Sequence, residues 1–303
     1  FSQIAGERHG VPVIRLHEGE LHAPKSLQDL VSPPILFTNE PKVVTNVHGD
    51  TLVSWYQSVG ASLNVFVSEG NSRTGGFSRP GSDEQLSLDH PGAEGLDGMF
   101  LDDSRPAISD QGERAVVWIQ PTELGESGVF LATRKPAEEW LRPSSFDEVL
   151  TKPGIITRCP KIAFSRHGDL FLTWLEVSAD GAMRAQLAHR DVRGNWLATG
   201  REPFRLSGSG FASCPEIATG RDGGVVASWI EKSLDGTDRV YVRRSSDEHV
   251  SPSESARWGR ATPLNTPAFG VPLNSVSVAV GGDDDRIAVA WTRAGRLELA
   301  TYD

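Results

Sequence analysis

Short apolar runs repeat along the chain, and each follows a tight turn. A glycine turn leads into apolar and β-branched residues that end in tryptophan at 49–55, 168–174 and 223–229. Such runs after a turn are typical of buried β-strands. No window of useful length has the 3.6-residue apolar period of a helix. The pattern therefore predicts an all-β protein.

Five tryptophans mark the repeat. They recur about every 60 residues, at Trp55, Trp118, Trp174, Trp229 and Trp291. One short apolar strand precedes each of these strands and two follow it, so a repeat carries four strands. Units of this length and strand number are typical of the blades of a β-propeller.

We expect one domain, a five-bladed propeller of four-stranded blades over residues 1–303. The expected blades cover 40–90, 104–152, 158–208, 213–267, and 274–303 together with 12–31. The last repeat ends after its third strand, and residues 21–30 parallel the fourth strand of the second repeat at 140–149. We therefore predict that the N-terminal segment closes the ring. A solenoid or two stacked sandwiches are the alternatives.

Composition narrows the class of protein. The chain has 30 basic and 40 acidic residues and a net charge of −10. This argues against nucleic acid or an anionic membrane as the main partner, because phosphate contacts need a basic stripe. No apolar run approaches the ~20 residues of a membrane span. The chain starts at Phe1, which fits a mature chain after signal cleavage or a trimmed one, and we expect an extracytoplasmic location.

The turns between third and fourth strands carry a degenerate motif. Residues 189–196, His-Arg-Asp-Val-Arg-Gly-Asn-Trp, approximate the Asp-box pattern Ser-x-Asp-x-Gly-x-x-Trp, and partial copies end at Trp140 and Trp258. With the repeat, they resemble the sialidase-like, BNR-repeat β-propeller superfamily over about residues 40–303. Sialidases of this superfamily are usually six-bladed propellers, and they act on glycans. The resemblance therefore implies a propeller and a glycan as ligand.

Candidate binding residues lie where the first strand of each blade starts. In propellers, the loops that lead into first strands and leave second strands share one face, where ligands gather. Arg105 and Arg158 could hold a carboxylate or sulfate there through the planar guanidinium group, beside Glu40. An ion pair between each arginine and a neighbouring acid is the alternative.

The two cysteines, Cys159 and Cys214, occupy equivalent positions before a proline in neighbouring blades. They could be two small buried thiols, because free cysteine is commonly buried. They could also form a disulfide, if the Cα atoms lie within ~4.4–6.8 Å. A third alternative is a copper or zinc site with two thiolate ligands. No other cofactor is expected.

Glu176 and Glu231 stand two residues after a tryptophan in the same two blades. Two carboxylates ~5–9.5 Å apart could hydrolyse a glycosidic bond. A polar residue at the end of a strand is also ordinary. The leading hypothesis is an extracytoplasmic propeller that binds a small molecule, glycan or metal without catalysis, with a protein partner possible. A sialidase-like hydrolase and a soft-metal protein are the alternatives.

Overall fold

The computed structural model describes most of the 303-residue chain. The described residues are 3–5, 8–13, 15–17, 20–22, 30–32, 38–59, 62–71, 76–78, 85–89, 104–122, 126–198, 202–208, 210–232, 236–245, 258–265, 272–281 and 286–302. The chain divides into two compact units, Phe1–Val149 and Leu150–Asp303.

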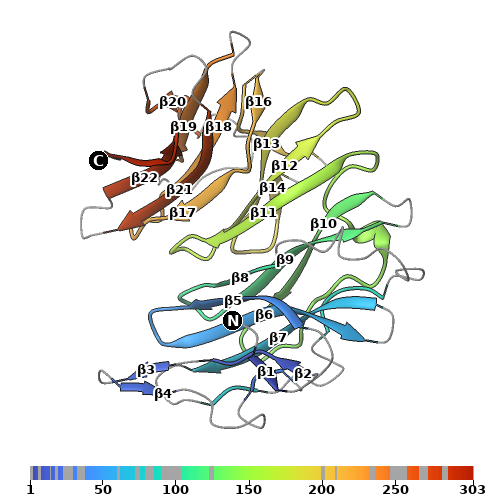
Figure 1. The fold of residues 1–303 in the computed structure, drawn as a ribbon. Coiled ribbons are helices and arrows are strands. Elements are labelled where there is room, and N and C mark those ends of the chain that lie inside the picture. Colours follow the sequence, from blue (N-terminus) through green and yellow to red (C-terminus); the bar gives the residue numbers. More distant parts are fainter. Residues whose placement is uncertain are drawn as a thin grey trace. The chain divides into compact units, whose positions relative to one another are not determined.

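The first unit holds two three-stranded antiparallel sheets and two small hairpins (Figure 1). One sheet has the order β5-β6-β7 and the other β8-β9-β10. Their strands are β5 (Thr38–Thr45), β6 (Asp50–Val59), β7 (Ser62–Asn71), β8 (Arg105–Ile108), β9 (Arg114–Pro121) and β10 (Ser127–Arg134). The hairpins pair β1 (Gln3–Ala5) with β2 (Arg8–Gly10) and β3 (Arg15–His17) with β4 (Glu20–His22).

The second unit holds three antiparallel sheets. The third sheet of the chain has the strand order β11-β12-β13-β14, and β15 also pairs with β13. The fourth sheet has the order β16-β18-β19-β20, and β17 also pairs with β18. The fifth sheet has the order β21-β22-β23. The strands of the third sheet are β11 (Ile156–Phe164), β12 (Leu170–Val177), β13 (Met183–Arg190), β14 (Trp196–Ala198) and β15 (Phe204–Arg205). Those of the fourth are β16 (Phe211–Ala212), β17 (Glu216–Thr219), β18 (Val225–Lys232), β19 (Asp238–Arg244) and β20 (Thr262–Pro263). Those of the fifth are β21 (Leu273–Gly281), β22 (Arg286–Arg293) and β23 (Arg296–Tyr302).

The predicted all-β class is confirmed. Within the described residues the helical structure is one short 3-10 turn, η3 (Phe146–Glu148), and no helix could cross a membrane. The five tryptophans lie on the second strands of five separate sheets, β6, β9, β12, β18 and β22. Successive strands run from the first to the last across each sheet, as in the blades of a propeller. The number of blades in a closed ring stays a prediction.

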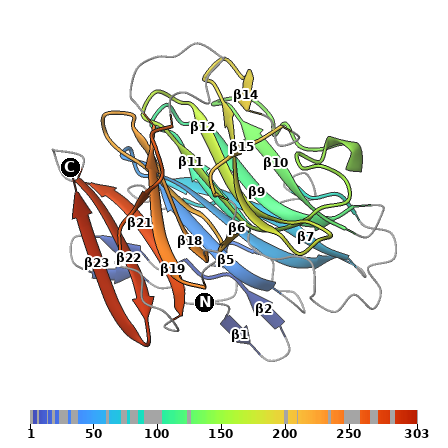
Figure 2. The same ribbon diagram turned by 90° about the horizontal axis from the view of Figure 1, so that it is seen from above.

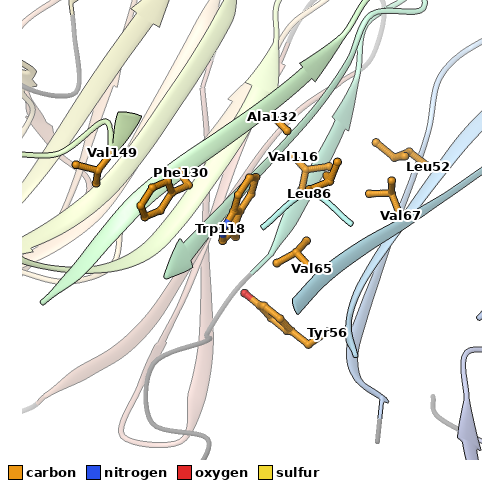
Figure 3. Packing of buried hydrophobic residues seen from close by; sticks show 10 residues of the cluster. All are labelled: Leu52, Tyr56, Val65, Val67, Leu86, Val116, Trp118, Phe130, Ala132 and Val149. Carbon is orange, nitrogen blue, oxygen red and sulfur yellow. The ribbon is translucent and has the colours of Figure 1, made fainter. Parts of the chain in front are cut away.

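Neighbouring sheets within each unit pack through the tryptophan face of the later sheet. Trp118 lies in a cluster with Tyr56, Val65 and Phe130 (Figure 3). Trp229 packs on residues of the third sheet, and Trp291 on residues of the fourth. Burial of an aromatic side chain of this size contributes about 4–6 kcal/mol. The tryptophans are therefore structural.

In the first, third and fourth sheets a pair of hydrogen bonds, here called the clamp, fixes the fourth-strand segment to the third strand. In the first sheet Leu86 N donates to Val65 O at 2.8 Å, and Val65 N donates to Ser87 Oγ at 2.9 Å. The same pair of bonds joins Leu206 and Ser207 to Ala185, and Leu264 and Asn265 to Val240. An apolar residue followed by a hydroxyl or amide residue is thus the chemical signature of a fourth strand.

The N-terminal segment forms a clamp of its own. Val31 N donates to Val11 O at 3.0 Å, and Val11 N donates to Ser32 Oγ at 2.9 Å. Val31 also packs with Val11 on the tryptophan face of the first sheet, beside Trp55. This clamp joins two parts of the N-terminal segment, and closure of the ring by this segment stays a prediction. Among the described strands, β23 pairs with β22 alone.

Candidate functional site

The strands that start the first and third sheets each contain a bulge opposite the tryptophan of the next strand, and in the fourth sheet β16 and β17 are separated at the equivalent place. The pairing of β11 with β12 shifts between Arg158 and Lys161, which leaves Cys159 outside the ladder. Glu40 occupies the same place in β5. Both residues adopt left-handed backbone angles, with φ of 55° at Cys159 and 51° at Glu40. Such a conformation costs about 1–3 kcal/mol in a residue with a side chain. The proline that follows each of them lies inside the strand.

Cys159 and Cys214 form a disulfide with Cα atoms 5.5 Å apart. The disulfide alternative is thus the one that the structure has, and the bond links the bulge of the third sheet to the segment between β16 and β17 of the fourth. Sulfurs in a disulfide are not thiolates, so the intact bond offers no ligand to copper or zinc. The described part of the chain also contains no cluster of three or more His, Cys, Asp or Glu side chains that could hold a metal.

Glu176 lies at the end of β12 and is 8% exposed. Its Oε1 accepts a hydrogen bond from Trp174 Nε1 at 3.2 Å, and its Oε2 accepts one from Gln186 Nε2 at 2.7 Å. A buried indole N–H needs an acceptor, because leaving it unpaired costs free energy. Both oxygens of this carboxylate therefore have structural partners.

Glu231 is 7% exposed and is bonded even more fully. Oε2 accepts from Trp229 Nε1 at 3.2 Å and from Gly208 N at 2.9 Å, while Oε1 accepts from Gly210 N at 2.9 Å. A Cβ atom at Gly208 would lie 2.8 Å from Glu231 Oε1, and one at Gly210 would lie 2.2 Å from Lys232 O. The two glycines let the backbone approach the carboxylate closely.

The first unit repeats this arrangement with glutamine. Trp55 Nε1 donates to Gln57 Oε1 and Trp118 Nε1 donates to Gln120 Oε1, both at 3.1 Å. Gln120 Oε1 also accepts from Leu88 N at 3.3 Å, and its Nε2 donates to Leu88 O at 2.5 Å. The residue two positions after the tryptophan is therefore the indole acceptor in four sheets.

The fifth sheet meets the same need from another strand. Arg293 stands two residues after Trp291 and cannot accept a hydrogen bond. Glu298 on β23 accepts from Trp291 Nε1 at 2.5 Å and pairs with Arg293 Nε at 3.5 Å. Sequence reasoning missed Glu298. A cation at the usual acceptor position, together with an acid on the following strand, is the signal that could have identified Glu298.

Arg158 is exposed at the strand entrance of the third sheet, next to the disulfide. Its neighbour Thr157 pairs with Glu176, and Arg158 itself pairs with Leu175. Glu40 and Arg105, both half-buried, lie at strand starts of the first unit. The structure tests none of these residues as ligand contacts, and their binding roles stay predictions.

Two exposed residues at the entrance of the fourth sheet were missed. Phe211 on β16 is 51% exposed and pairs across the sheet with exposed Lys232. The next pair along is Ala212 with Glu231. An exposed aromatic ring beside a cation suits a ring-shaped ligand with negative charge. The aromatic signal was present in the sequence but does not recur in the repeat.

A half-buried cation interacts with Glu231. Arg243 places its guanidinium group 5.2 Å from the centre of the Phe204 ring, which stacks on Trp258. Burial lowers the pKa of Arg243, and the negative charge of Glu231 opposes this shift. The charge on Glu231 therefore also stabilises a half-buried guanidinium group.

The Asp-box-like segment forms a hydrogen-bonded turn between β13 and β14. Asp191 accepts from Asn195 N at 2.7 Å and from Asn195 Nδ2 at 3.0 Å, and Gly194 has a φ of 93°. Burial raises the pKa of Asp191, but the hydrogen bonds from Asn195 outweigh it, so the pKa lies below its usual value. The aspartate here acts as a turn acceptor.

Comparison with known proteins rests on solved structures. No protein-family model matches the sequence, and no curated protein does. The Hadza microbial sialidase Hz136 matches with a TM-score of 0.51 and 11% identity, over 88% of this chain and 56% of its own. The polysaccharide lyase Uly1 matches at 0.54 and 11%, over 94% and 65%. An ulvan lyase of family PL25, bound to -[GlcA(1-4)Rha3S]-, matches at 0.55 and 9%, over 88% and 64%.

The chain thus spans between 56% and 65% of the length of these three proteins. At such low identity the likeness concerns the fold alone. The predicted resemblance to sialidase-like β-propellers is confirmed at that level: this chain has the fold of a sialidase and of two polysaccharide lyases.

Proposed function

We propose that the chain binds a glycan at the strand entrances of the third and fourth sheets, and that Glu176 and Glu231 do not cleave it. The bonding of the two carboxylates carries this proposal. Each accepts an indole N–H, and their remaining oxygen positions accept a side-chain amide or backbone N–H groups. A general acid or nucleophile must be able to reach the scissile bond.

The fold likeness to glycan-active proteins favours a glycan over other ligands. The ulvan lyase holds a chain of glucuronate and sulfated rhamnose, so that propeller accommodates an anionic sugar polymer. Arg158 and Lys232 supply exposed positive charge at the proposed site, and Phe211 supplies an exposed ring. A guanidinium group and an aromatic face are suited to a carboxylate or sulfate on a sugar ring.

The proposal includes five blades around a central channel and an extracytoplasmic location. Five sheets with their tryptophans on the second strand support the blade count. The disulfide supports the location, because such bonds persist in oxidising compartments. A soft-metal function has no further support, since the intact disulfide leaves no thiolate.

Isothermal titration with ulvan oligosaccharides and with sialyllactose tests the binding function. We expect saturable binding of an anionic glycan without product formation, and a tenfold or larger loss of affinity in Arg158→Ala. Arg166→Ala is the matched control, because Arg166 is an exposed arginine in the turn at the other end of β11. Absence of binding to both probes, or equal loss in both variants, would contradict the proposal.

A glycoside hydrolase that uses Glu176 and Glu231 is the second candidate, favoured by the fold likeness to a sialidase. Chromogenic glycosides, assayed with wild type and with Glu231→Gln, separate the two functions. Turnover by the wild type that disappears in the variant, while the variant stays folded, would establish the hydrolase and exclude binding alone.

A further inference from the structure

The clamp residue of the third strand has a fixed place in the repeat. Val65, Ala185 and Val240 each pair with the residue that follows the tryptophan of the second strand. All three are fully buried, at 0% exposure. The fourth strand therefore covers a defined position on the outer edge of the third strand.

The fifth sheet has the same position without a fourth strand. Leu297 pairs with Thr292, the residue after Trp291, and is 75% exposed. Leu299 on the same strand is 64% exposed. Figure 2 shows β23 as the outermost strand of its sheet, and β22 is its one partner among the described strands. Because ladder groups alternate in an antiparallel pair, the register puts the N–H and C=O of Leu297 on the outer edge.

The clamps specify what would fit this edge. Each uses an apolar residue followed by Ser or Asn. In the first sheet Asn64 Nδ2 also donates at 3.2 Å to Asp89 Oδ1, two residues beyond the clamp serine. On β23 the residue in the place of Asn64 is Arg296, which is exposed. An acid at that position of the incoming strand would therefore meet a positive charge.

We propose that the outer edge of β23 is a docking site for an extended strand of a partner protein. The strand carries an apolar residue, then Ser, Thr or Asn, and an acid two residues later. It continues the interface that the third and fourth strands form in the first, third and fourth sheets. The N-terminal pair Val31 and Ser32 is not free for this role, because it already clamps Val11. Addition of a strand to an exposed edge is a known mode of peptide recognition.

A fluorescent peptide with the sequence of residues 83–89, Asp-Glu-Gln-Leu-Ser-Leu-Asp, is a suitable probe. We expect saturable binding to the full chain in fluorescence polarisation, with a Kd on the order of 100 µM. Leu297→Pro removes the outward N–H without touching the ladder to β22, and should weaken binding at least tenfold. Leu297→Thr keeps that N–H and a strand-forming residue, so it should keep binding within threefold.

A charge swap tests the register without a proline. Arg296→Glu should weaken the acidic peptide at least fivefold, and replacing the last Asp of the peptide by Lys should recover the loss. No saturable binding up to about 1 mM, or binding unaffected by every change on β23, would overturn the proposal. Dimerisation in analytical ultracentrifugation that Leu297→Pro abolishes would also overturn it, because the occupant would then be a second copy.

Discussion

The most discriminating prediction concerns the replacement of Glu231 by Gln. In the wild type the carboxylate accepts three N–H groups, from Trp229, Gly208 and Gly210. Glutamine offers one carbonyl oxygen, so its NH2 group must face at least one buried N–H. An unsatisfied buried donor costs about 1–3 kcal/mol. The half-buried guanidinium group of Arg243 also loses a nearby negative charge. We therefore expect a loss of about 2–4 kcal/mol in the free energy of unfolding.

The matched variant is Glu176→Gln, at the equivalent place in the third sheet. The new carbonyl can still accept from Trp174, as Gln57 does from its own tryptophan. Its NH2 group faces Gln186, whose Oε1 has no hydrogen-bond partner within the described residues. Rotation of the Gln186 amide by half a turn restores a donor and acceptor pair. We expect a loss of no more than about 1 kcal/mol.

Urea denaturation, followed by circular dichroism, measures both variants in the same unit of the structure. The difference between the two losses should exceed about 1.5 kcal/mol at an unchanged m-value. The reverse swap in the first unit, Gln120→Glu, should also destabilise, because a carboxylate would face the carbonyl oxygen of Leu88. If the losses in free energy of unfolding of Glu231→Gln and Glu176→Gln differ by less than about 0.5 kcal/mol, the backbone N–H groups do not require a carboxylate at position 231 and the reasoning is wrong.

Three further predictions concern other residues. Cys159→Ser with Cys214→Ser should lose up to about 4 kcal/mol of stability in urea, because the disulfide closes a separation of 55 residues; an unchanged midpoint would contradict this. Thr173 is fully buried and its hydroxyl has no partner within the described residues, so Thr173→Val should stabilise by about 1 kcal/mol, whereas Ser54→Ala, which loses a hydroxyl bond of 3.1 Å, should destabilise. Asp191 has a lowered pKa in the folded state, so its contribution is present above the unfolded pKa of ~3.9 and is lost as pH falls through the lower folded value. Asp191→Asn should flatten the dependence of stability on pH below 4, and equal slopes would contradict this.

The sequence predicts the strands well because the burial that shapes them is local. A glycine turn and an apolar run ending in tryptophan identify the second strand in four sheets, and in the fifth the run to Trp291 follows Asp285 instead of a glycine. The bulges were not predictable, because the left-handed backbone at Glu40 and Cys159 belongs to residues that rarely adopt it. Nothing in an Xaa-Pro pair distinguishes a strand that begins there from one that bulges.

The residue pattern of the clamp is present in the sequence but was not recognised there. Leu86, Leu206 and Leu264 are each followed by Ser or Asn. A two-residue pattern of common residue types has little weight by itself, and the hydrogen bonds give it meaning. The same pattern at Val31 and Ser32, which bond Val11, explains why the N-terminal segment resembles a fourth strand.

The choice between Gln and Glu after the tryptophan was also beyond sequence reasoning, since it depends on a segment distant in the chain. Leu88 presents both an N–H and a C=O to Gln120, whereas Gly208 and Gly210 present two N–H groups to Glu231. An amide satisfies the first arrangement and a carboxylate the second. Glu176 and Glu231 looked like a catalytic pair because they are the two acids among the four indole acceptors. The other two acceptors, Gln57 and Gln120, are neutral and belong to the first two sheets.

In a repeat protein, comparison of equivalent positions identifies the residues with a structural role before function is assigned. A side chain whose counterparts in other sheets make the same bond carries little information about a ligand, and Glu176 and Glu231 belong to that group. Arg158 does not, because its counterparts in the repeat are Asn or Ser. Lys232 does not either, since the other sheets have Ser, Pro, Val and Ala in its place. Exposed cations that break the repeat, such as Arg158 and Lys232, which pairs with exposed Phe211, are where selection for a ligand would act without disturbing the fold.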